Sequence, residues 1–125
     1  MGRVKGGMRW VLPLGWAGLL FLISSQPDLD LPLPFEHADK VLHGVLYGVF
    51  GAAILWALKS STPRDLAVTV LVASLYGITD EFHQAFVPGR TPEVADWMAD
   101  STGALLGALC VGWVKRLKQE KGTVL

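Results

Sequence analysis

The spacing of charged residues constrains this chain more than any other feature of its sequence. Eighteen uncharged residues separate Arg9 from Asp28, and another eighteen separate Lys40 from Lys59. At about 1.5 Å per residue, either run is long enough to cross the hydrocarbon core of a bilayer, which is about 30 Å thick. A helix on the surface of a soluble protein keeps one polar face, and these runs have none. They predict two membrane-spanning helices, over about 9–25 and 40–58.

Two more helices are predicted if acidic residues are accepted within them. Only fourteen uncharged residues separate Asp65 from Asp80, and fourteen separate Asp100 from Lys115, which is too short to span a membrane. Extending each helix through its acids gives two spans of sufficient length, joined by the turn Pro88-Gly89-Arg90. The predicted spans are about 66–87 and 95–114. We therefore expect an all-α integral membrane four-helix bundle that forms a single domain over 1–125.

The distribution of basic residues predicts how the helices are oriented. Nine of the eleven lysines and arginines fall at the helix ends shared with the two termini, and two, Lys40 and Arg90, fall at the opposite ends. By the positive-inside rule, both termini of this multi-pass protein are expected in the cytoplasm, on the inner side of the cytoplasmic membrane. The basic start resembles a signal peptide, but Ser24-Ser25-Gln26 offers no small-x-small cleavage site, so the first helix is expected to be retained. Zero net charge gives no reason to expect a nucleic-acid partner.

Polar residues from three predicted helices fall in one layer, within about 10 Å of the outer boundary. Helical spacing places each group on one face of its helix, and a charge facing lipid would cost at least about 2.5 kcal/mol, so these faces are expected to turn inward. The candidate polar-site residues are Lys40, His43, Tyr47, Asp80, Glu81, His83, Gln84, Arg90, Asp96 and Asp100. Two small-x-x-x-small pairs, Gly44 with Gly48 and Gly103 with Gly107, predict close packing of the second and fourth helices.

The stretch from Leu75 to Arg90, followed by Asp96-x-x-x-Asp100-x-x-Gly103-x-x-x-Gly107, resembles the VanZ-like family of bacterial membrane proteins. An earlier block, Asp39-Lys40-x-x-His43-x-x-x-Tyr47, fits the same family, and the resemblance covers most of 20–110. The family is named after a protein from a glycopeptide-resistance cluster that is associated with lowered susceptibility to teicoplanin. Many members carry asparagine at the position of Asp100. The residues that match the family motif are Lys40, His43, Tyr47, Glu81, Gln84, Arg90, Asp96 and Asp100.

Three functions are left open by these residues. The first is binding of an amphiphile at the outer leaflet, such as a membrane lipid, a cell-wall lipid precursor or a lipoglycopeptide, with Arg90 contacting a phosphate or carboxylate. The second is a metal-dependent hydrolase or transferase, because the layer holds oxygen and nitrogen ligands; no HExxH-type spacing supports it, so a divalent metal is not expected. The third, ion translocation, ranks lowest because the polar groups occupy only the outer half of the membrane, although a homo-oligomer would change this.

Overall fold

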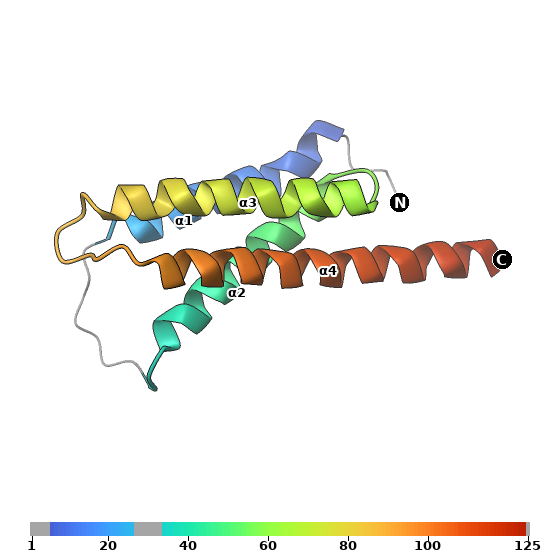
Figure 1. The fold of residues 1–125 in the computed structure, drawn as a ribbon. Helices are drawn as coiled ribbons and strands as arrows, with labels where there is room; N and C mark the ends of the chain where they lie inside the picture. The colour runs from blue at the N-terminus through green and yellow to red at the C-terminus, as the bar shows by residue number, and fades with distance from the viewer. Residues whose placement is uncertain (1–5, 27–33, 125) are drawn as a thin grey trace.

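The computed structural model describes residues 6–26 and 34–124, and this part of the chain contains four α-helices and no strand (Figure 1). A short 3-10 helix, η1 (Gly6–Trp10), leads directly into α1 (Val11–Ser24). The other helices are α2 (Ala38–Ala57), α3 (Pro63–Gln84) and α4 (Val94–Val124). The expected all-helical fold is confirmed.

Local sequence sets where α3 begins and ends. Thr62 Oγ1 accepts a hydrogen bond from the Asp65 backbone N–H at 3.2 Å, and Asp65 Oδ2 accepts one from the Thr62 N–H at 3.0 Å. This capping box, with Pro63 at the first helical position, fixes the start of the helix. α3 ends at Gln84, short of the expected 87, and a turn over 87–90 follows in which Gly89 has a φ of 79°. A left-handed glycine after a proline is typical of a type II turn.

The last helix is longer than expected. α4 continues past residue 114 to Val124, through a segment rich in lysine, arginine, glutamine and glutamate. The charged residues that begin at Lys115 end the apolar span of this helix. They are nevertheless strong helix formers, so the helix itself continues.

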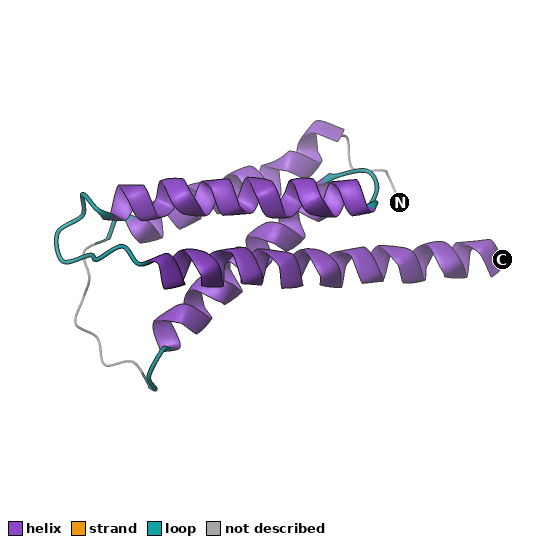
Figure 2. Cartoon of the chain, in the orientation of Figure 1, coloured by secondary structure: helices purple, strands orange, loops and turns teal. Residues whose placement is uncertain are grey.

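The turn after α3 and the start of α4 lie at the same end of the molecule as the end of α1 (Figure 2).

α2 and α4 form the most extensive interface, and they cross at an angle, while α3 runs antiparallel beside α4 (Figure 1). A Cβ atom added to Gly103 would lie 2.1 Å from Gly44 O, and one added to Gly107 would lie 1.9 Å from Gly48 O. Both distances are far below van der Waals contact, so the two backbones touch at these positions. Gly44 itself is less constrained, since its Cβ would lie 3.8 Å from the nearest atom outside its own helix. Close backbone approach of this kind is typical of packed membrane helices.

α1 packs against α2 and α3 and is held partly through its backbone. The Tyr76 hydroxyl donates to the Ala17 carbonyl at 2.5 Å, and Trp16 Nε1 donates to the Leu46 carbonyl at 2.9 Å. Leu20 is buried in the same cluster of hydrophobic side chains. α1 therefore covers one side of a unit built by the other three helices.

The distribution of polar and apolar side chains is the reverse of that in a soluble protein. On α3, Leu75 and Phe82 are 53% and 68% exposed, whereas Asp80 is buried, and Asp100 of α4 is 0% exposed. Soluble proteins rarely bury carboxylates and seldom present large apolar surfaces to water. Among the described residues, three helical segments are long and apolar enough to span a membrane: Gly6–Ser24, Ala38–Ala57 and Val94–Gly122. α3 is not among these three segments, although its exposed side chains include Leu75 and Phe82.

Candidate polar site between the helices

The first turn of α2 contributes a lysine that contacts three carboxylates. Lys40 Nζ lies 2.8 Å from Asp39 Oδ2, from Glu93 Oε2 and from Asp96 Oδ1. The contacts with Asp39 and Glu93 are hydrogen bonds. Asp96 Oδ1 has no hydrogen-bond partner among the described residues, so its contact with Lys40 is an ion pair without a hydrogen bond. Glu93 was not predicted from the sequence, although an acidic residue directly before a helix is a common feature of helix starts. Lys40 thus joins α2 to the beginning of α4.

One turn further along α2, His43 pairs with the most buried acid of the site. His43 Nδ1 lies 2.8 Å from Asp100 Oδ1 of α4. Asp100 is fully buried, and its other oxygen, Oδ2, has no hydrogen-bond partner among the described residues. A further turn along, the Tyr47 hydroxyl donates to Asp80 Oδ2 of α3 at 3.0 Å. Three consecutive turns of α2 therefore each contact an acidic residue of α3 or α4.

Glu81 brings α3 into the same group. Glu81 Oε2 accepts a hydrogen bond from the Glu93 backbone N–H at 3.1 Å, while Oε1 is buried without a partner among the described residues. Single ligand atoms of Glu81, His43 and Asp100 all lie within 4.8 Å of one another. Gln84, one turn after Glu81, is also buried. The site is therefore a buried cluster supplied by three helices.

Two candidate residues face α1 instead of this cluster. His83 Nε2 lies 2.8 Å from Ser25 Oγ, and its ring stacks on Phe21 with centroids 4.6 Å apart. Arg90 donates from Nε to the Gln26 carbonyl at 2.9 Å and from Nη2 to the Ile23 carbonyl at 3.1 Å. The last carbonyls of a helix lack partners within it, so the guanidinium satisfies the end of α1. Arg90 and His83 therefore hold the end of α1 in place.

A recess of about 360 Å³ lies next to the buried cluster, where α3 ends and α4 begins. Its walls are apolar apart from the two acids Glu81 and Glu93. Trp97, which forms one wall, is fixed by a hydrogen bond from Nε1 to the Ser74 carbonyl at 2.9 Å. The residues that line the recess are Ile78, Glu81, Pro92, Glu93, Val94 and Trp97. An apolar space thus meets the polar layer at its edge.

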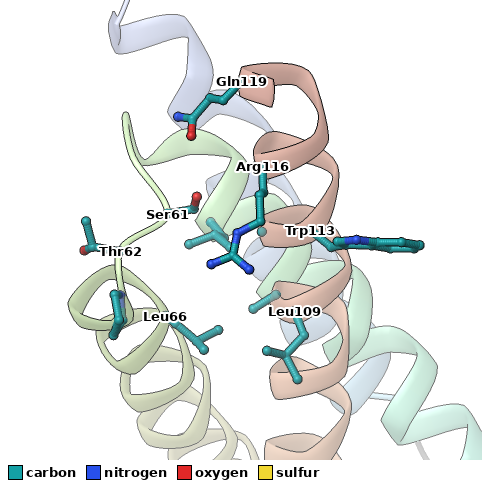
Figure 3. Close-up of a pocket in the computed structure, with 11 residues that line it drawn as sticks. Ser61, Thr62, Leu66, Leu109, Trp113, Arg116 and Gln119 are labelled. Atoms are coloured by element: carbon teal, nitrogen blue, oxygen red, sulfur yellow. The ribbon is translucent and has the colours of Figure 1, made fainter. Parts of the chain in front are cut away.

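A second recess of about 420 Å³ lies between the turn that joins α2 to α3 and the later part of α4 (Figure 3). Figure 3 shows the Arg116 guanidinium directed into the space between α3 and α4, while the Trp113 ring extends from the other side of α4. Nearby, Lys115 Nζ donates to the Leu55 and Leu58 carbonyls at 2.6 and 2.8 Å, which satisfies the end of α2. Tryptophan beside basic residues is typical of a membrane–water interface. The described residues that line this recess include no acid, so it differs chemically from the buried cluster.

Helices that face outward with apolar side chains and enclose a buried layer of acids define a multi-pass membrane protein with an internal polar site. The chain belongs to the VanZ/LLP1 family, whose model matches residues 9–115, as its motifs indicated. It is also similar to "Uncharacterized protein C11E3.10" of Schizosaccharomyces pombe, with 29% identity over 92 residues. That match covers 73% of this chain and 57% of the yeast protein, so this chain spans little more than half of that relative. No solved structure matches the chain.

Proposed function

We propose that this VanZ-family protein binds the headgroup of an amphiphile in the outer leaflet of the bacterial cytoplasmic membrane, with both termini in the cytoplasm. The topology follows from the basic residues, because Lys115 and Arg116 lie at the opposite end from the buried cluster and mark the cytoplasmic side. The buried cluster then lies at the depth of the outer headgroups. Membrane lipids, cell-wall lipid precursors and lipoglycopeptides such as teicoplanin all present a polar headgroup beside an acyl chain at this depth.

The observation that carries the proposal is the apolar recess that ends at Glu81 and Glu93. Its apolar walls, which include Ile78 and Trp97, suit an acyl chain or the glycerol region of a lipid, and its acids suit a polar headgroup. Glu81 Oε1 has no hydrogen-bond partner among the described residues, and burying such an oxygen unpaired is costly. A bound headgroup would supply a donor to one of the two acceptor positions of this oxygen.

The charges of the site indicate the chemistry of that headgroup. Lys40 is already shared among three carboxylates, and Arg90 is bonded to the carbonyls at the end of α1. Neither cation is directed at the recess, so the phosphate-binding role expected for Arg90 is not part of the proposal. The oxygens of Glu81 and Glu93 accept hydrogen bonds, so we favour a headgroup with amino or hydroxyl donors, as in phosphatidylethanolamine or a lipid-linked sugar.

Binding to the purified protein in nanodiscs tests this proposal. A panel of labelled phosphatidylethanolamine, phosphatidylcholine, a lipid-linked disaccharide and teicoplanin would be titrated against wild type, Glu81→Gln and Val94→Trp. Glu81→Gln removes a charged acceptor, worth about 1.5–3 kcal/mol, which corresponds to a rise in Kd of about tenfold or more. Val94→Trp places a bulky ring in the recess and is expected to weaken binding similarly.

Met98→Trp is the matched control, because Met98 is exposed on the same helix but does not line the recess. It is expected to bind like wild type. Equal affinity of all four proteins for every member of the panel would refute the proposal. Binding of phosphatidylcholine, whose headgroup has no N–H or O–H donor, more tightly than phosphatidylethanolamine would refute the assignment of a donor headgroup.

A further inference from the structure

The structure assigns a second ligand to the buried cluster: we propose that His43, Glu81 and Asp100 bind one divalent transition-metal ion. These residues come from α2, α3 and α4, and each supplies one ligand atom to a group whose members all lie within 4.8 Å of one another. Two ligands on opposite sides of a metal ion are about 4 Å apart, since metal–ligand bonds to nitrogen and oxygen are about 2.0–2.2 Å long. The observed separation therefore needs only small side-chain movements.

The unpartnered oxygens provide independent support for a cation at this position. Glu81 Oε1 and Asp100 Oδ2 are both buried and have no hydrogen-bond partner among the described residues. Asp100 is 0% exposed, so water at the surface does not compensate for the missing bond. An ionised carboxylate oxygen can accept a hydrogen bond but cannot donate one, so a buried carboxylate oxygen needs either a donor or a cation beside it. Two such oxygens beside an imidazole suit a metal ion.

The charges around the cluster lead to the same conclusion. The ammonium group of Lys40 contacts Asp39, Glu93 and Asp96, and not the acids of the cluster. Glu81, Asp100 and the nearby Asp80 therefore share no lysine or arginine contact in the described residues. Among the described residues, the basic side chain that contacts these acids is His43, which pairs with Asp100. Three buried carboxylates exceed the charge that one imidazole can supply, and a divalent cation would neutralise two of them.

The surroundings of the ligands are those of a prepared metal site. The Glu93 N–H bonds to Glu81 Oε2 at 3.1 Å and orients that carboxylate, as partners of metal ligands commonly do. The 2.8 Å contact between His43 Nδ1 and Asp100 Oδ1 brings two of the proposed ligands together, and binding of the metal through Nδ1 would release any proton that this contact shares. One imidazole with two carboxylates suits Zn²⁺ or Mn²⁺ better than Ca²⁺ or Cu⁺. Three protein ligands would leave coordination positions for water or for an oxygen of another ligand.

Metal titration of the purified full chain tests the inference. Protein stripped with EDTA would be titrated with Zn²⁺ alone and Mn²⁺ alone in nanodiscs, and the bound metal measured by mass spectrometry after desalting. Wild type is expected to bind about one ion per chain, and His43→Ala and Asp100→Asn to raise the Kd at least about tenfold. His37→Ala is the matched control, because His37 is exposed and lies outside the cluster; it is expected to bind like wild type.

A second measurement on the wild-type protein avoids dependence on variants that fail to fold. Pulsed electron paramagnetic resonance of bound Mn²⁺ is expected to show coupling to an imidazole nitrogen. Binding of less than about a tenth of an equivalent, or bound Mn²⁺ without nitrogen coupling, would overturn the inference. The Val94→Trp variant is expected to lose amphiphile binding and to retain metal binding, so the two sites are tested separately. If the protein binds the amphiphile but takes up no metal, the metal site is ruled out and the proposed function is not.

Discussion

Replacing Gly107 with alanine tests the close contact of α2 and α4 on which the buried cluster depends. The added Cβ would lie 1.9 Å from Gly48 O and 2.7 Å from Gly48 C. Carbon and oxygen atoms in contact are normally about 3.3 Å apart or more, so the two helices must separate locally by roughly 1.4 Å. The obstacle is backbone, which a change of side-chain rotamer cannot relieve.

The expected cost can be separated from the effect of alanine on the helix itself. Overpacking typically costs about 1–3 kcal/mol, and alanine returns up to about 1 kcal/mol through its higher helix propensity. Gly112→Ala, on the same helix, shares the gain in propensity, but its Cβ would meet Leu55 Cδ2 at an ordinary 3.5 Å. The difference between the two variants in free energy of unfolding is therefore expected to be about 1–3 kcal/mol.

Unfolding in mixed detergent micelles, followed by far-ultraviolet circular dichroism, measures this difference. The same separation would lengthen the 2.8 Å contact between His43 and Asp100 beyond hydrogen-bond range. Gly107→Ala is therefore also expected to weaken ligand binding at the cluster, while Gly112→Ala leaves it unchanged. Equal unfolding free energies for the two variants would show that the glycine contact does not hold α2 against α4.

Three further substitutions address hydrogen bonds at different levels of the bundle. Tyr47→Phe leaves Asp80 without its donor and is expected to lower the unfolding free energy by about 1 kcal/mol; unchanged unfolding in micelles would contradict this. Arg90→Ala removes two bonds to the end of α1, so hydrogen exchange is expected to accelerate in the last turn of α1 and not in α4; equal rates in wild type and variant would exclude this role. Lys115→Met keeps an apolar side chain but frees the carbonyls at the end of α2, and a loss of about 1–2 kcal/mol is expected in the same unfolding assay; wild-type stability would count against it.

The number of helices was predictable from the sequence because charge is expensive in lipid. The uncharged runs after Arg9 and Lys40 predicted two spans directly. The other two followed from accepting Asp80 and Asp100 inside helices, and both acids are indeed buried in the structure. The end of α4 was not predictable in this way, because charge composition limits the apolar span and does not stop a helix from continuing into water.

The pairing of the polar residues was not predictable from helical spacing. Spacing showed that His43 and Tyr47 share a face of α2, but it does not fix the rotation of α2 against its neighbours. That rotation is set by the backbone contacts of Gly103 and Gly107, which depend on atomic distances. Sequence reasoning consequently grouped Arg90 with the acids, whereas in the structure its guanidinium is bonded to the end of α1.

The attachment of α1 through its carbonyls has a consequence for how its sequence can vary. Tyr76 and Arg90 bond to the Ala17, Ile23 and Gln26 carbonyl oxygens, which every amino acid possesses. Substitutions along the outward face of α1 therefore leave these attachments intact, provided that the helix remains apolar and keeps its position. On α4, by contrast, the contact surface is the bare glycine backbone, where any side chain intrudes. Substitutional freedom in this protein should accordingly be high on the outward face of the first helix and low along one narrow stripe of the last.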